Sequence, residues 1–229
     1  MGNETKKKGK IMVVANPIYD TVFKFLMEDE RIARTILSAL LKMDIIRVEL
    51  QPDTIQRSLR DALSVCRLCF TARLDDHNKK SCSISFLKTR HPHEIISLFP
   101  LQQSDILIYL LGQKVENVKN PVVDIENCPI DNLKGKKGII IQIPRIQYVA
   151  DNRQNMILSI FSQAYQHEQQ VISISESNYS SDIEVLRVLQ RLQEIALNID
   201  MRMDMNCEDE FFWHLSKQYK QNRYASQKS

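Results

Sequence analysis

Apolar residues recur every three or four positions over several stretches of the chain, which predicts amphipathic helices. Between Asp20 and Leu41 this spacing is interrupted near residues 28–30, so two consecutive helices separated by a turn are expected there. The same periodicity predicts a helix over residues 152–166, another over 183–196 and a last one over about 208–219. These segments supply the helical part of the fold.

Shorter apolar runs, bounded by polar or proline-containing stretches, predict strands. Two of them, residues 67–74 and 83–88, form a hairpin around the polar stretch 75–80. The remaining extended runs cover residues 13–17, 45–50, 106–111, 139–143 and 171–174. Helices and strands interleave without a repeat or a flexible linker, so we expect a single-domain α/β fold with a mixed, mainly antiparallel sheet flanked by helices.

The hairpin has two chemically distinct faces, because successive residues of a strand point to opposite sides. Leu68 and Phe86 belong to the apolar face, whereas Cys69, Ser85 and Leu87 belong to the other. If the turn centres near residue 77, antiparallel pairing places Cys69 directly across from Ser85.

Composition and charge are those of a globular protein. The chain has 229 residues, 43% of them hydrophobic, and a net charge of +3. Residues 1–10 carry +3 and residues 214–229 carry +4, which leaves −4 on the body. We therefore expect a basic disordered tail over residues 1–11, one domain over 12–215 and a second basic disordered tail over 216–229, without a uniformly basic nucleic-acid surface.

Several classes of protein are excluded by what the sequence lacks. No apolar run reaches the length of about 18 residues that spans a bilayer, and the first residues contain no apolar signal segment. No glycine-rich phosphate-binding loop occurs, so no small-molecule cofactor is expected. The cysteines are odd in number and irregularly spaced, and Cys66 and Cys69 should point to opposite faces of one strand. Free thiols and a cytoplasmic location without membrane contact are the resulting expectations.

Residues 16–29, which read NPIYDTVFKFLMED, resemble the opening of the bacterial PD-(D/E)XK nuclease-family transposases, the group that includes the recombination-promoting nucleases. Further segments are similar to later motifs of that family and occur in the same order within about residues 12–215. These segments are residues 139–145, 158–163, 172–176, 191–193 and 205–211.

The resemblance implies a restriction-endonuclease-like fold and metal-dependent DNA cleavage. Phosphodiester hydrolysis needs divalent cations, and Mg²⁺ prefers carboxylate oxygens. The family takes one Asp from the first hairpin strand and one Glu from the second, followed two residues later by Gln or Lys. An Asp of the N-terminal helix accompanies them, in a motif matched here by Asp20 and Lys24.

At the critical positions the sequence departs from that pattern. The strand Asp falls on Cys69, the Glu on Ser85 and the following Gln or Lys on Leu87, while Asp20, Lys24 and Lys88 remain. A thiol and a hydroxyl cannot replace two carboxylates around Mg²⁺. We therefore expect a vestigial site at Asp20, Cys69 and Ser85 that holds no metal, and cleavage that is absent or severely weakened.

The retained residues also have simpler interpretations. Asp20 precedes a helix, where an aspartate caps exposed N–H groups, and this is the favoured role. Lys24 and Lys88 either line a groove or cover a surface. Asp75 and Asp76 fit a solvated turn, and residues 91–94, which read HPHE, fit a loop better than a metal site.

Three functions are consistent with the sequence. The favoured one is a DNA-contacting or regulatory module of the nuclease family that has lost cleavage. The alternatives are an active metal-dependent DNA endonuclease with an altered site, and a homo-oligomer or protein partner of an active paralogue. Phe211, Phe212 and Trp213 bear on the last possibility, because three adjacent aromatic residues of a helix cannot all face the core.

Overall fold

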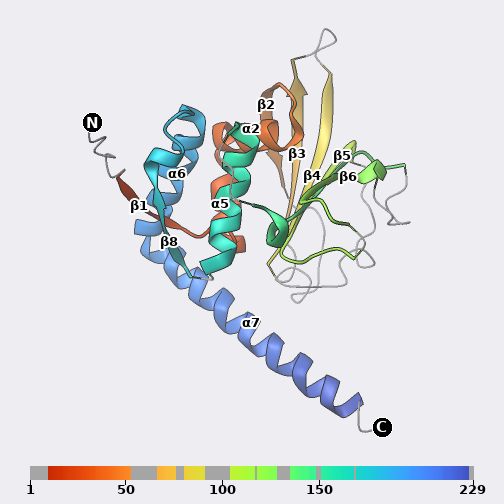
Figure 1. Cartoon of the computed structure of the whole chain (residues 1–229), viewed down its shortest axis with the longest axis vertical. Coiled ribbons are helices and arrows are strands. Elements are labelled where there is room, and N and C mark those ends of the chain that lie inside the picture. Colours follow the sequence, from red (N-terminus) through yellow and green to blue (C-terminus); the bar gives the residue numbers. More distant parts are fainter. Residues whose placement is uncertain are drawn as a thin grey trace, which may run out of the picture.

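The computed structural model describes residues 10–52, 66–75, 80–90, 104–116, 118–127, 135–147, 151–167 and 169–226. A twisted six-stranded sheet has helices packed against one of its faces, and a long C-terminal helix extends away from them (Figure 1). This confirms the expected mixed α/β architecture. The sheet strands are β2 (Ile45–Gln51), β3 (Cys66–Leu74), β4 (Ser81–Thr89), β5 (Ile106–Leu111), β6 (Val122–Asp124) and β7 (Gly138–Gln142).

The sheet has the strand order β2-β3-β4-β5-β7-β6. Strands β2, β3 and β4 are antiparallel neighbours, β4, β5 and β7 run parallel, and β6 returns antiparallel to β7. Cys69 lies directly across from Ser85, as the turn geometry predicts. The β3–β4 hairpin is therefore the connection between the antiparallel and parallel parts of the sheet.

Two short strands form a separate ribbon. Strand β1 (Ile11–Ala15) pairs antiparallel with β8 (Val171–Ser175), and neither joins the main sheet. Both segments are correctly predicted as extended, but their pairing joins parts of the chain that are far apart in sequence. Local periodicity carries no information about such a partner.

The helices are α1 (Asp20–Met27), α2 (Glu30–Leu41), α5 (Arg153–His167), α6 (Ile183–Leu197) and α7 (Ile199–Ser226). The predicted turn between the first two is present. Asp29 caps α2 by accepting hydrogen bonds from the backbone N–H groups of Arg31 and Ile32. Single turns of 3₁₀ helix occur at Ile125–Asn127, Ile143–Arg145 and Glu176–Asn178.

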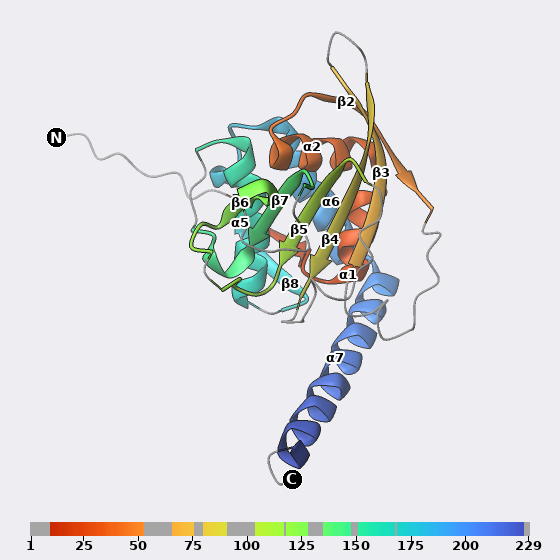
Figure 2. The ribbon, with the colours of Figure 1, turned by 90° about the vertical axis from the view of Figure 1, so that its right-hand side faces the viewer.

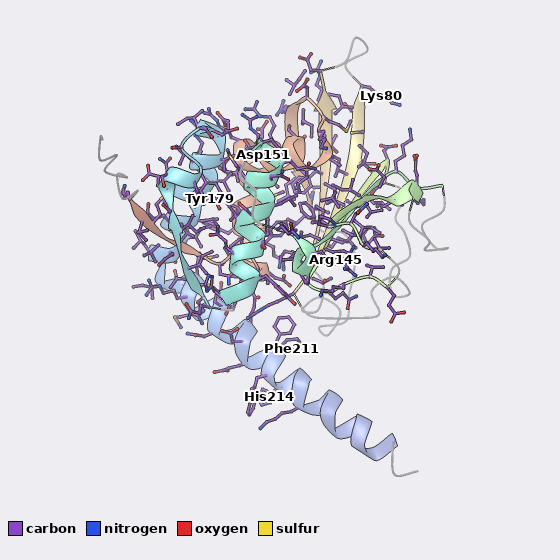
Figure 3. All side chains as sticks on the ribbon, in the orientation of Figure 1. Lys80, Arg145, Asp151, Tyr179, Phe211 and His214 are labelled. Atoms are coloured by element: carbon purple, nitrogen blue, oxygen red, sulfur yellow. The ribbon has the colours of Figure 1, made fainter. Side chains whose placement is uncertain are left out.

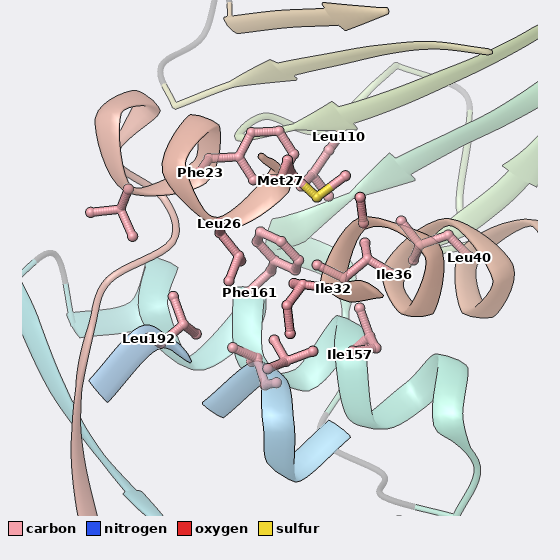
Figure 4. Close-up of a cluster of buried hydrophobic side chains, with 14 of the residues drawn as sticks. Phe23, Leu26, Met27, Ile32, Ile36, Leu40, Leu110, Ile157, Phe161 and Leu192 are labelled. Atoms are coloured by element: carbon pink, nitrogen blue, oxygen red, sulfur yellow. The ribbon is translucent and has the colours of Figure 1, made fainter. Parts of the chain in front are cut away.

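The main core lies between the sheet and the helices α1, α2, α5 and α6 (Figures 2 and 4). Phe23 of α1 contacts Phe86 of β4 edge-on, with ring centroids 5.0 Å apart, and Phe161 of α5 at 6.0 Å. A smaller core on the opposite face of the sheet contains Leu87, Tyr109 and neighbouring residues of β5 and β7. Both faces of the β3–β4 hairpin are therefore partly covered, each by a different set of residues.

Helix α7 is longer than the sequence predicts. It begins at Ile199 and continues to Ser226, so its backbone is helical where a disordered tail is expected from residue 216. The first half packs against α1 and α6, and the second half extends away from the body in both views (Figures 1 and 2). Of the described helices, none is both long and apolar enough to span a bilayer.

Candidate functional site

Lys88 is the centre of a buried ionic cluster at the carboxyl end of β4. Its side chain is fully buried, and Nζ donates to Asp20 Oδ1 and to the backbone carbonyl oxygen of Ile18, both at 2.5 Å. The ammonium group also lies 5.5 Å from the centre of the Phe23 ring. Lys88 therefore neither lines a groove nor covers a surface; it neutralises the carboxylate of Asp20 inside the fold.

Asp20 does not cap its helix, contrary to the favoured expectation. Tyr19 is the N-cap residue of α1, and no side chain of its own segment caps the helix. Glu208 of α7 takes this role: its two carboxylate oxygens accept from the backbone N–H groups of Asp20, at 2.9 Å, and Thr21, at 2.6 Å. The Asp20 carboxylate instead accepts from Lys88 Nζ.

Two carboxylates thus share this cluster with one lysine. Glu208 is largely buried, and burial, followed by the nearby negative charge of Asp20, raises the pKa of Glu208. The N-terminus of α1 partly offsets that cost through the helix dipole and its two backbone donors. The cluster consequently links α1, β4 and α7 by charge.

A second layer surrounds the cluster on its outer side. Asp209 accepts hydrogen bonds from the Tyr19 hydroxyl at 2.9 Å and from Arg90 at 3.1 Å, and the Arg90 guanidinium lies 4.1 Å above the Tyr19 ring. Gln170 also donates to Asp209, at 3.3 Å. Burial is the main cause that raises the pKa of Tyr19 to about 12. This layer attaches the base of α7 to β4 and to the turn before α1.

Cys66 lies beside Lys88 in the strand register and is completely buried. Burial, with a smaller contribution from Asp20, raises the pKa of its thiol to about 12. The thiol therefore stays protonated and is a poor nucleophile. Cys69 is half-buried and points to the other face of the strand, so the two cysteines cannot chelate one ion. The described cysteines are free thiols, as expected.

A neutral polar row occupies the opposite face of the hairpin. Cys69 Sγ lies 3.7 Å from Ser85 Oγ, and Ser85 Oγ lies 2.6 Å from Ser104 Oγ. Ser85 is fully buried, and Leu87 is part of the smaller core. This row contains hydroxyl and thiol groups but no carboxylate.

The residues expected to form the vestigial site are therefore divided between two faces. Asp20 contacts Lys88 on the side covered by α1, whereas Cys69 and Ser85 contact each other on the opposite side. Lys24 is exposed and, together with Cys69 and Arg67, lines a pocket of about 430 Å³ beside the last residues of β2. Lys24 and Cys69 thus share a pocket, but Asp20 and Lys88 do not line it.

These residues do not fit a magnesium ion. The described residues include no group of three or more histidine, cysteine, aspartate or glutamate side chains placed to hold a metal. Asp20 is neutralised by Lys88, and both oxygens of Glu208 accept backbone hydrogen bonds. Mg²⁺ would have to displace an ammonium group and two N–H donors from the available carboxylates.

Some candidate residues lie outside the described part of the chain, namely Asp76 and residues 91–94. Asp75 is exposed at the end of β3, which fits the solvated turn expected there. Glu208, Asp209, Arg90 and Tyr19 are absent from the predicted site. The sequence contains only one indication of the first two, which is that they lie in a segment resembling a family motif.

Comparison of the chain with models of protein families, with curated proteins and with solved structures finds no match.

Proposed function

We propose that this protein is a degenerate member of the PD-(D/E)XK nuclease-family transposases, with a restriction-endonuclease-like fold, that contacts DNA without cleaving it. The ordered motif segments of the sequence support the family. The arrangement of the hairpin, with helix α1 over one face and Asp20 directed at that face, is compatible with it. The free thiols of the described residues are compatible with a reducing, cytoplasmic location.

The Lys88–Asp20 ion pair is the observation that carries the proposal. A working nuclease site holds carboxylates whose negative charge is balanced by metal ions. Here the balancing charge is the ammonium group of Lys88, which is fully buried 2.5 Å from Asp20 Oδ1. A fixed cation of the protein therefore takes the place of a divalent ion.

The proposal does not depend on one alignment of the hairpin motif. If Lys88 is the motif lysine, the glutamate position two residues earlier is Phe86, and the residue across from it is Leu68. Both are buried in the main core. If the motif residues are instead Cys69 and Ser85, they are neutral as well. In either register the two strand carboxylates are missing.

Two assays on the full chain test the proposal. Supercoiled plasmid incubated with the protein and Mg²⁺ or Mn²⁺ should stay intact, whereas a fluorescein-labelled duplex should bind, with affinity that falls steeply as salt rises. Nicking or linearisation that disappears in Asp20→Asn would show an active enzyme. Binding that is absent even at low salt would refute the DNA-contacting role.

A second candidate function, that of an oligomeric partner of another protein, is favoured by one observation. Leu197, Ile199 and Met203 are 76%, 75% and 61% exposed and belong to the segment where α6 ends and α7 begins. Exposed apolar residues that cluster in this way are typical of protein interfaces. Sedimentation velocity of the wild type and of Leu197→Ser/Met203→Ser tests this: a dimer lost in the variant supports it, and a wild-type monomer with no partner-dependent shift argues against it.

A further inference from the structure

The charge of α7 changes sign where the helix leaves the body. Residues 199–210 contain five acidic residues and one arginine, whereas residues 211–226 contain Lys217, Lys220 and Arg223 and no acid. Phe212 is 9% exposed and Trp213 is 53% exposed. Phe212 is the last residue of α7 described as buried, and it lies where the charge of the helix changes sign. We call residues 213–226 the α7 arm. Figure 3 shows the body ending near Phe211, with His214 farther along the helix.

The arm is a cationic rod about 20 Å long, at 1.5 Å per residue. Trp213 and Lys217 are four residues apart and therefore lie on the same side of the helix. Lys217 Nζ lies 3.5 Å from the centre of the Trp213 ring. A positive charge is thus already held next to an exposed indole.

General stabilisation of the helix explains a cation in its last turn, such as Arg223, but not the lysines that precede that turn. Cations favour the C-terminal end of a helix only within about the last turn, and Lys217 lies well before that turn. Glutamates or aspartates placed four residues away would stabilise the helix by local pairing, but residues 211–226 contain none. Basic residues without any acid among them give the arm a positive potential that is complementary to a polyanion.

We propose that the α7 arm binds the phosphate backbone of duplex DNA. This inference rests on the proposed function and assigns its DNA contact to the arm rather than to the pocket at β3. Duplex DNA is the polyanion of the proposed function, and its phosphates complement the single sign of charge along the arm. A single helix also fits the width of the major groove, where phosphates flank it on both sides. Lys217, Lys220 and Arg223 are the residues proposed to contact phosphates.

Trp213 makes the test direct, because it is the only tryptophan of the chain. The full-length protein is titrated with a short labelled duplex, and the anisotropy of the label and the emission of Trp213 are recorded together. If the arm binds, both signals change with the same midpoint. The charge-reversal variant Lys217→Glu/Lys220→Glu/Arg223→Glu should weaken binding about tenfold or more and lower the slope of log K against log salt by about 0.9 per lost phosphate contact.

A matched control separates a local contact from net charge. The variant Lys6→Glu/Lys7→Glu/Lys8→Glu changes the charge by the same amount at the other end of the chain and should retain most of the affinity. If the two variants lose DNA affinity equally, net charge alone explains the loss, and the proposal is overturned. Far-UV circular dichroism checks that each variant folds, and Lys220→Glu alone, with a smaller loss of the same sign, supports the reading if the triple variant unfolds.

The remaining outcomes distinguish the two proposals. Binding by anisotropy that leaves Trp213 emission unchanged and survives in the arm variant refutes the arm but retains the DNA-contacting function. No binding at all refutes both. A dimer in sedimentation velocity that the arm variant abolishes, without DNA binding, assigns the arm to the acidic body of a second copy instead.

Discussion

The two faces of the β3–β4 hairpin differ in how they hold polar groups. On the side covered by α1, Lys88, Asp20 and Glu208 form a buried charged cluster with direct ion and hydrogen-bond partners. On the opposite side, Cys69, Ser85 and Ser104 form a neutral row. On the α1 side, the counter-charge of Lys88 and the backbone donors of α1 compensate the desolvation of the two buried carboxylates.

The largest expected effect comes from removing the counter-charge. Lys88→Met leaves Asp20 and Glu208 buried without a cation, and breaking such a pair costs about 3–5 kcal/mol of unfolding free energy. Urea unfolding followed by far-UV circular dichroism measures it, with Lys24→Met, which changes an exposed lysine of α1, as the control. Adding Asp20→Asn to Lys88→Met should restore much of the loss; if it restores nothing, charge is not what the cluster contributes.

A smaller loss should follow from removing the cap that α7 supplies to α1. Glu208→Ala deletes acceptors for the N–H groups of Asp20 and Thr21, and losing an N-cap typically costs about 1 kcal/mol, up to about 2. Glu210→Ala, an exposed acid in the same turn of α7, should change stability by less than about 0.5 kcal/mol. Equal effects of the two variants would contradict the assigned cap.

The neutral row of Cys69, Ser85 and Ser104 should respond least to mutation. Ser85→Ala removes one hydroxyl between Cys69 and Ser104 and should cost about 1 kcal/mol, the usual net value of a neutral hydrogen bond. A loss as large as that of Lys88→Met would mean that the neutral row contributes as much stability as the charged cluster. The same urea experiment decides this.

The pH dependence of stability should contain contributions of opposite sign. The pKa of Glu208 is raised in the folded state, so its contribution is fully present below the ordinary value of 4.5 and is lost as pH rises through the folded-state pKa. The pKa of Glu184 is lowered to about 2, mainly by the hydrogen bond from Arg31, so its contribution is present above 4.5 and is lost as pH falls toward 2. The urea midpoint of each variant is measured between pH 2 and 7. Glu208→Gln should remove only the loss of stability with rising pH, and Glu184→Gln should remove only the loss of stability with falling pH.

The faces and the pairing of the hairpin can be predicted from the sequence, because they depend only on residues that are close together in the chain. Strict alternation assigns its faces, and the length of the polar turn fixes Cys69 opposite Ser85, as found. The capping role of Glu208 could not be predicted from the sequence. Nothing near an acidic residue of one helix indicates that it will accept hydrogen bonds from the N-terminus of another helix, here from Asp20 and Thr21, which lie 188 and 187 residues earlier. The same holds for Lys88, whose burial depends on Asp20 arriving from α1.

The extent of α7 was missed for a different reason. Its hydrophobic periodicity is interrupted by the charged residues of 199–210, and only Met201 and Met205 among them are buried apolar residues. The polar, basic composition after residue 216 resembles a solvated tail, although Lys, Gln and Arg are good helix formers. The composition of this segment therefore predicts a tail, whereas the helix propensity of its residues is compatible with the helix that is found.

The central proposal is that the ammonium group of Lys88 takes the place that a divalent cation has in a nuclease site. Isothermal titration calorimetry of the full chain with Mn²⁺ and Mg²⁺ tests it most directly. The account predicts no saturable heat for either ion, in the wild type or in Asp20→Asn. Saturable binding in the wild type that is lost in Asp20→Asn would place a metal at the cluster and contradict it.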